Sequence, residues 1–330
     1  MALAARTDEH PIPIDCGDGT DSPVDCVPPT EAGYFGGFGT LACRASALTT
    51  ELIARVSDCV ADVRLGEDIA EYHGDPDYVS TSAVKTYLTG GPEAFYARHV
   101  ARTEQQAESA AMSHGTFLHT WFETRDDELS FAVVPPPSEL TAGGGIGQKA
   151  LKWAAENAGA GAPVVSPKEF EQAQKEVAAV LRAAGGLLDS VVANEVSIRF
   201  EINGHKVRCR DDALTRDRVL DLKTTREANV KRDFWKSILD YGYDVQDWVY
   251  QRGMEACGME AAPLIFIVVS TTSAQCCCGT IPQELTKAAG ERVAAALEDI
   301  ALRKELDWWM PDDHGDVIEF PVPARFLGRN

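Results

Sequence analysis

The stretch "RCRDDALTRDRVLDLKTT", from Arg208 to Thr225, decides the fold of this 330-residue chain. It contains the end of one alternating apolar and polar run, "HKVRCRDDAL", and the whole of a second, "RVLDLKT". A third run, "EVSIRFEI", lies just upstream, and Asn203 and Gly204 separate it from the first. Asn-Gly between two such runs is the strongest short signal for a β-hairpin. The sequence therefore predicts three successive strands, and the quoted stretch gathers four aspartates and five basic residues.

The hairpin turn fixes the register of the first two strands. With a two-residue turn at Asn203 and Gly204, Glu195 lies opposite Asp212. Because strand side chains alternate between two faces, Asp212 falls on the polar face beside Glu195 and two arginines. Its neighbour Asp211 points to the apolar face unless a bulge intervenes. The register thus favours Asp212 over Asp211 as a site residue.

Asp221 and Lys223 project from one face of the third strand, because they are two residues apart. A short polar connection brings Asp221 beside Asp212. Glu195, Asp212 and Asp221 then form a cluster of three carboxylates, with Lys223 next to it. Carboxylates are ligands that Mg²⁺ and Mn²⁺ prefer, and a bound metal can activate water and polarise a phosphodiester. A nearby lysine can orient that water or stabilise the transition state. The alternative is a solvated strand edge with ion pairs.

Two predicted helices carry further polar groups. His119 and Glu123 are four residues apart and share a helical face. Tyr243, Gln246 and Tyr250 form one stripe at i, i+3 and i+7. A lone histidine among aromatic residues and an aromatic stripe are both typical of core packing. A glutamine inside the stripe, however, requires a polar partner.

The order of predicted elements indicates a mixed α/β or α+β fold around one central sheet. Residues 1–48 are rich in Pro, Gly and Asp and predict a poorly structured extension, with one domain over residues 49–330. Two further strands are expected in "PLIFIVVST" and "QCCCGTIP". Helices are expected over about 51–65, 80–100 with a break at Gly90-Gly91-Pro92, 115–124, 147–158, 167–184, 232–257 and 282–306.

Composition narrows the class of protein. The net charge of −20 argues against a surface that coats nucleic acid non-specifically, although residues 205–236 hold ten Lys and Arg against six Asp and Glu. No apolar run is long enough for a membrane span, and the first residues lack a secretion signal, so we expect a cytoplasmic protein. The nine cysteines include no C-x-x-C pair. Free thiols are favoured over an iron–sulfur site built from Cys257 and the cysteines at 276–278.

The ordered motifs resemble those of the PD-(D/E)XK nucleases, in particular the RecE-like exonuclease VIII group of phages and prophages. The matching segments are "YVSTSAVKTYLTGGPEAFY", "GTFLH", "GQKALKWAAENAG", "VVSPKEFEQAQ", "CRDDAL", "DLKTT" and "YGYDVQDWVY", which together cover about residues 78–258. The resemblance implies a restriction-endonuclease-like core with a central mixed sheet flanked by helices. This sequence departs from the family pattern at one position: the family usually has a proline before the first acidic ligand, and this sequence has Asp211 there.

The resemblance also assigns roles by position. Metal ligands are His119, Asp212, Asp221 and the backbone carbonyl of Leu222. Lys223 is the catalytic lysine, and Gln246 and Tyr250 match the Q-x-x-x-Y pair beside the active site. Glu195 is a supporting residue of the same group. Candidate phosphate contacts are Arg208, Arg210, Arg226, Lys231, Arg232 and Lys236, several of which are equally explained as surface ion pairs.

The implied activity is a Mg²⁺-dependent (or Mn²⁺-dependent) exodeoxyribonuclease that resects linear duplex DNA, 5′ to 3′, and leaves 3′ overhangs for recombination and annealing. The implied partners are DNA ends, a RecT-like single-strand annealing protein and further copies in a ring, with no membrane. One alternative is a Cas4-like or endonucleolytic enzyme of the same superfamily. The other is a non-cleaving module that binds DNA or a partner.

Overall fold

The computed structural model describes residues 61–104, 110–126, 128–158, 162–310 and 317, and these build a seven-stranded sheet. Its order is β1-β3-β4-β5-β6-β7, with β2 also paired to β4. Only the β2/β4 and β5/β6 pairs are parallel. The strands are β1 (Asp62–Leu65), β2 (Val79–Ser80), β3 (Ala193–Ile202), β4 (His205–Leu214), β5 (Val219–Thr225), β6 (Ile265–Ser270) and β7 (Cys276–Gly279).

The hairpin of β3 and β4 has the predicted turn and register. Asn203 and Gly204 both have positive φ, 52° and 80°, as a two-residue hairpin turn requires. The pairing runs without a slip from Ile202 with His205 at the turn to the far end of the hairpin, but it skips Glu195, which has a φ of 51°. Side-chain alternation changes at this step: Val207 and Cys209 before it enter the same core as Leu214 after it, whereas Ala213 enters the other core.

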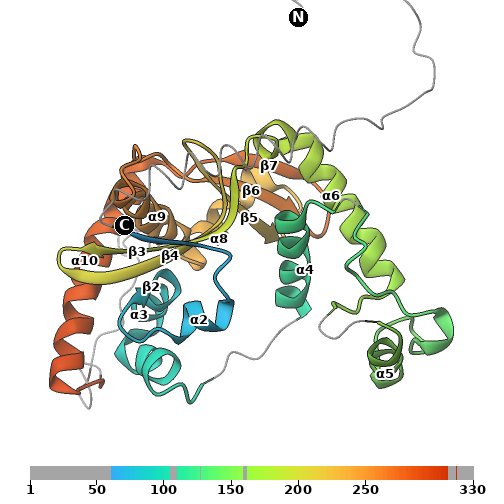
Figure 1. Ribbon diagram of the computed structural model, residues 1–330, viewed down its shortest axis with the longest axis horizontal. Helices are drawn as coiled ribbons and strands as arrows, with labels where there is room; N and C mark the ends of the chain where they lie inside the picture. The colour runs from blue at the N-terminus through green and yellow to red at the C-terminus, as the bar shows by residue number, and fades with distance from the viewer. Residues whose placement is uncertain (1–60, 105–109, 127, 159–161, 311–316, 318–330) are drawn as a thin grey trace, which may run out of the picture.

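Helices cover both faces of the sheet (Figure 1). They are α2 (Ile69–Gly74), α3 (Thr81–Phe95), α4 (Ala110–Thr124), α5 (Gln148–Asn157), α6 (Pro167–Leu188), α7 (Val230–Asp233), α8 (Trp235–Asp240), α9 (Tyr243–Ala256) and α10 (Gln283–Leu306), with a π-helical turn at Tyr96–Val100 and a 3-10 turn at Pro137–Glu139. None of the helices in the described ranges is both long and apolar enough to cross a membrane.

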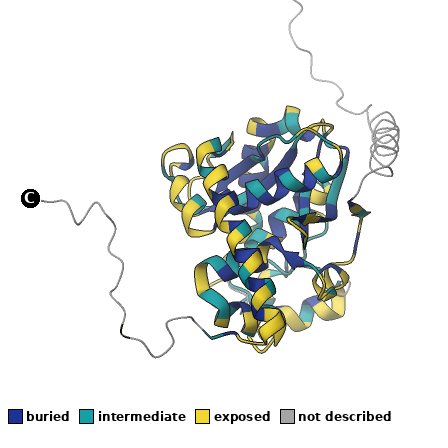
Figure 2. Ribbon diagram, turned by 90° about the vertical axis from the view of Figure 1, so that its left-hand side faces the viewer, coloured by how far each residue is buried: buried dark blue, intermediate teal, exposed yellow. Residues whose placement is uncertain are grey.

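Two hydrophobic cores lie on opposite faces of the sheet. Helices α3, α9 and α10 form one core with residues such as Ile198, Phe200 and Val268. Helices α4 and α6 form the other with Leu220, Leu222 and other residues. Figure 2 shows the result, with buried residues in the strands and inner helix faces and exposed residues outside. The sheet is thus the middle layer between two groups of helices, and side chains of these helices pack on each of its two faces.

Most predicted elements are confirmed, and two are wrong. Residues 62–65 form strand β1 although a helix was expected over 51–65, because tertiary pairing with β3 overrides a weak helical pattern. The helix expected over 232–257 is divided among α7, α8 and α9, and Gly242, with a φ of 60°, makes the break between α8 and α9. The predicted extension, residues 1–48, lies outside the described residues.

Arg199 on β3, next to Ile198 and therefore on the opposite face of the sheet, is the centre of an ion-pair network. The Arg199 guanidinium is almost fully buried and donates to both carboxylate oxygens of Glu67, at 2.6 and 3.1 Å. A third bond reaches Asp75 Oδ2 at 3.3 Å. These contacts hold the segment around α2 against β3. Removing one partner would leave the other charge buried without compensation.

Glu67→Gln should therefore lower the free energy of unfolding by about 3 kcal/mol. Combining Arg199→Met with Glu67→Leu should restore most of it, because neither charge then remains buried. Urea unfolding followed by circular dichroism measures both. Lys175→Ala, which breaks an exposed pair with Glu171 on α6, is the control and should change little. A double variant as unstable as the single one would contradict this account.

Candidate active site

Strands β4 and β5 pair at only two positions, Ala213 with Leu220 and Leu214 with Val219. Beyond them β5 continues along β6, whereas β4 continues along β3 and β2. We call this point of separation the β4–β5 fork. Asp212 on β4 and Asp221 on β5 are the first residues beyond the last pair. The two predicted carboxylates therefore meet where the sheet opens.

Asp212 occupies the place of a missing backbone partner. Its Oδ2 accepts a hydrogen bond from the Leu222 amide at 3.0 Å, a bond that a continued ladder would make with β4 backbone. The amide and carbonyl of a strand residue project to the same edge, so the Leu222 carbonyl also faces the fork. His119 on α4 lies beside the same carboxylate, with Nδ1 3.4 Å from Asp212 Oδ2. The structure thus brings these three predicted residues together.

Asp221 is fully buried and is held from two sides. Lys223 Nζ lies 2.6 Å from its Oδ2, and the side-chain amide of Gln246 donates to its Oδ1. Gln246 stands on α9, so its polar partner, required by the sequence, is the candidate metal-binding carboxylate. Helix α9 thereby fixes the orientation of Asp221.

Lys85 on α3 is a site residue that the motif reasoning did not single out. Its Nζ donates to Gln246 Oε1 at 2.9 Å and lies 5.2 Å from the centroid of the Tyr243 ring. Lys223 Nζ lies 5.3 Å from the same centroid. The sequence could have pointed to Lys85 in one way, since it directly follows Val84, an apolar residue that faces the core from the same helix.

Burial and like charges shift the titration of these groups. Burial raises the pKa of Asp212, and Asp221 adds to that shift, although His119 opposes it. Burial disfavours the charged form of Lys223, but Asp221 and Asp212 outweigh it and raise the pKa above its ordinary value. Lys223 is therefore a cation at neutral pH. Asp211 is enclosed on the apolar side, as expected, and burial raises its pKa well above the usual range.

The donor set fits a hard divalent cation in part. No three His, Cys, Asp or Glu side chains within the described ranges are gathered as a metal cluster. Two carboxylates nevertheless lie close enough at the fork for Asp221 to raise the pKa of Asp212. A cation between them would remove this repulsion, with His119 and the Leu222 carbonyl as the remaining candidate donors.

Two other predicted catalytic residues, Tyr250 and Glu195, contact Arg210 on strand β4. The Tyr250 hydroxyl donates to the carbonyl of Arg210 at 2.7 Å and thus ties α9 to β4. Glu195 on β3 forms an ion pair with Arg210 on β4. The described contacts of both residues are thus with Arg210 and hold strand β4 in place.

Arg208 and Arg210, expected as phosphate contacts, lie under α2. Arg208 is buried, donates to the carbonyl of Asp75 and stacks over Tyr72. Arg210 donates to the carbonyl of Glu67 at 2.8 Å. Because these groups pack the segment around α2 against the sheet, the structure does not present them to a substrate.

Four exposed basic residues follow β5: Arg226, Lys231, Arg232 and Lys236. Arg232 pairs with Asp233 at 2.7 Å, and Lys236 lies 3.4 Å from Glu227. Exposed pairs of this kind are weak, so they can exchange for phosphate contacts. These four residues remain candidates for that role.

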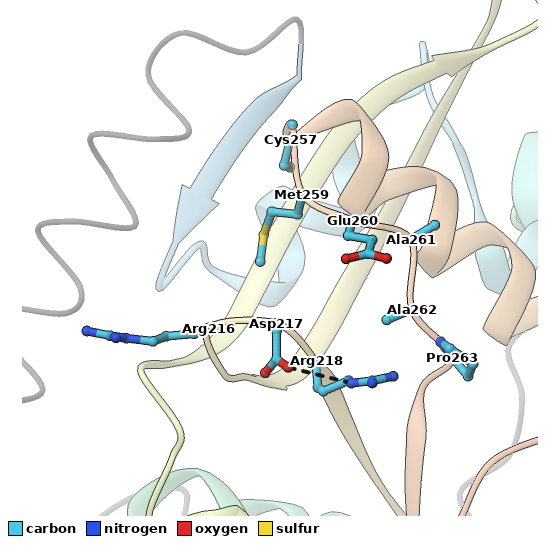
Figure 3. Close-up of a pocket in the computed structure, with 10 residues that line it drawn as sticks. Arg216, Asp217, Arg218, Cys257, Met259, Glu260, Ala261, Ala262 and Pro263 are labelled. Atoms are coloured by element: carbon cyan, nitrogen blue, oxygen red, sulfur yellow. Dashed lines mark ion pairs between the residues drawn. The ribbon is translucent and has the colours of Figure 1, made fainter.

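A cavity of about 700 Å³ lies away from the fork residues (Figure 3). The turn Arg216–Arg218 between β4 and β5 and the segment 257–263 after α9 line it. Figure 3 shows Arg216 directed away from Glu260, and Arg218 pairs with Asp217 at 3.8 Å. Its charges are mixed and none of the fork side chains lines it, so it is not the candidate active site.

Comparisons with known proteins agree with the fold. A crystal structure of a protein from Eubacterium rectale, described as a "Putative exonuclease", superposes with a TM-score of 0.54 at 16% identity, over 80% of this chain and 98% of that one. This likeness concerns the fold alone. A search of the curated proteins finds no match. The model of the family described as "PDDEXK-like domain of unknown function (DUF3799)" matches residues 80–311, which include the β4–β5 fork, and the chain therefore belongs to this family of PDDEXK-like domains.

Proposed function

We propose that the protein is a Mg²⁺-dependent exodeoxyribonuclease that resects linear duplex DNA, 5′ to 3′, and leaves 3′ overhangs. The observation that carries this proposal is the meeting of Asp212, Asp221 and Lys223 at the β4–β5 fork. Membership of a PDDEXK-like family supports a nuclease, and the description of the Eubacterium rectale protein as an exonuclease favours that type. A RecE-like role beside a RecT-like annealing protein, within a ring of copies, belongs to the same proposal.

Each residue has a defined task in this reaction. Asp212 and Asp221 would hold Mg²⁺ with the Leu222 carbonyl and His119, and the ion would supply an activated water and neutralise charge on the phosphate. Lys223 remains protonated beside Asp221, so it donates to an anionic oxygen and orients the phosphate. Gln246 keeps Asp221 in the orientation that presents its carboxylate to the gap.

The arrangement of the cysteines favours this proposal over a Cas4-like enzyme. Cys276 and Cys278 pack toward the core of α6, whereas Cys277 packs toward the core of α9. Adjacent strand residues point to opposite faces, so the three thiols do not converge on one cluster. Cys257 is buried separately in the core of α9.

Purified protein with Mg²⁺ should degrade linear duplex DNA and leave covalently closed circles intact, because an exonuclease requires an end. Gel analysis of 5′-labelled, 3′-labelled and circular substrates measures both the requirement and the polarity. Cutting of closed circles would favour the endonuclease alternative. End binding without Mg²⁺-dependent loss of DNA would favour the non-cleaving module.

Asp221→Ala and Lys223→Ala should each lower the degradation rate at least about a hundredfold, because each removes a group that stabilises charge at the phosphate. Initial rates on linear DNA measure the effect, and circular dichroism verifies the fold. Lys152→Ala, an exposed lysine on α5, is the matched control and should keep the parent rate. Full activity in both site variants would refute the site.

Gln246→Ala should raise the Mg²⁺ concentration needed for half-maximal activity about tenfold or more, because Asp221 loses the amide that orients it. A Mg²⁺ titration of the initial rate measures this shift. Gln275→Ala, at an exposed turn, should leave the titration unchanged. An unshifted midpoint in Gln246→Ala would show that the amide does not position the metal-binding carboxylate.

A further inference from the structure

Lys85 lies beside the fork, and the only polar partner of its side chain in the described structure is a neutral amide. Its ammonium donates to Gln246 Oε1, and no carboxylate oxygen of the described residues lies within ion-pair distance of it. Lys223, which lies 5.3 Å from the centroid of the same tyrosine ring, has Asp221 at 2.6 Å. The two lysines therefore differ in their partners: Lys223 has a counter-ion among the described residues, and Lys85 has none there.

The chain holds the Lys85 side chain firmly in place. Its stem packs on Gly242, where an added Cβ would lie 3.5 Å from Lys85 Cγ. The Tyr243 ring lies beside its ammonium, and the residue is only partly exposed. Fixing a long side chain costs conformational entropy, and shielding an ammonium from water costs solvation. Neither cost is offset by an ion pair among the described residues.

The electrostatic surroundings agree with an unfilled anion position. Burial and the charge of Lys223 lower the pKa of Lys85 to about 7. The charged or titratable groups that face it are Lys223, Asp221, Asp212, Asp244 and Tyr243. Asp244 is already paired with Arg292, and Asp221 with Lys223. An incoming anion would favour the protonated form of Lys85, an ammonium for which the described residues provide no ion-pair partner.

We propose that Lys85 and Lys223 form a phosphate-binding site on the α3 side of the fork, in which Lys85 contacts a backbone phosphate of the DNA strand being cut. This assignment rests on the proposed nuclease function and extends it. Lys223 acts at the reacting phosphate, and Lys85 provides the second positive charge beside the Tyr243 ring. Gln246 holds the ammonium in place until DNA arrives and simultaneously orients Asp221.

The test measures binding of a short blunt-ended duplex by fluorescence anisotropy, with Ca²⁺ in place of Mg²⁺, over a series of salt concentrations. Each phosphate neutralised by a cation contributes about 0.9 to the slope of log affinity against log salt. Lys85→Met should reduce this slope by about 1, and Lys85→Arg should retain it. Lys175→Met, an exposed lysine on α6, should leave the slope unchanged. With Mg²⁺, Lys85→Met should raise KM more than it lowers kcat.

Stability separates this role from a structural one. Lys85→Met should keep or raise the urea midpoint, because it removes a shielded charge that lacks a counter-ion. A lower midpoint together with an unchanged salt slope would assign Lys85 to packing and overturn the proposal. A slope change seen only with 5′-phosphorylated ends, and not with 5′-hydroxyl ends, would also overturn it, since the anion would then be a terminal group.

Failure of this proposal is distinguishable from failure of the proposed function. If the parent protein neither binds nor degrades DNA, both are overturned. If the parent binds and degrades DNA but Lys85→Met has the parent's slope and KM, only the assignment of Lys85 is overturned.

Discussion

The early separation of β4 from β5 is the constraint on which the candidate site depends. If the ladder continued, Asp212 and Asp221 would be cross-strand neighbours with like charges, which destabilise a sheet. Because the strands separate, the Asp212 carboxylate takes the Leu222 amide instead, and the backbone remains satisfied. The same gap lets α4 reach the carboxylates from one face and α9 from the other. One local departure from regular pairing thus provides both the space and the polar groups of the site.

Both a charged group and a neutral amide hold the carboxylate of Asp221 in place. Lys223 balances one carboxylate directly, whereas Gln246 joins Asp221 to Lys85 through the two ends of a single amide. An amide has one donor end and one acceptor end, so it can connect a carboxylate with an ammonium in only one orientation. Clustered, shielded charges of this kind cost stability, and they are expected where function rather than folding determines the residues.

The sequence was sufficient for the hairpin, its register and the meeting of Asp212 with Asp221, because these follow from a two-residue turn and a two-residue period. It was not sufficient for Glu195, Arg208 and Arg210. Their faces were predicted, but a segment more than 120 residues away covers the two arginines. Lys85 was missed for the same reason, since its partner Gln246 stands on a distant helix. Local patterns specify strands well, whereas contacts between remote segments depend on packing.

The burial of Arg208 and Arg210 changes how a polyanion would meet this molecule. Both count toward the basic excess of residues 205–236, yet both are engaged with the segment around α2. Less of this basic excess is therefore exposed than the sequence suggests, in a chain with net charge −20. At cellular ionic strength charges act over about 8 Å. DNA would be repelled on approach and held only on contact, so that added salt would speed the encounter while weakening the complex that forms.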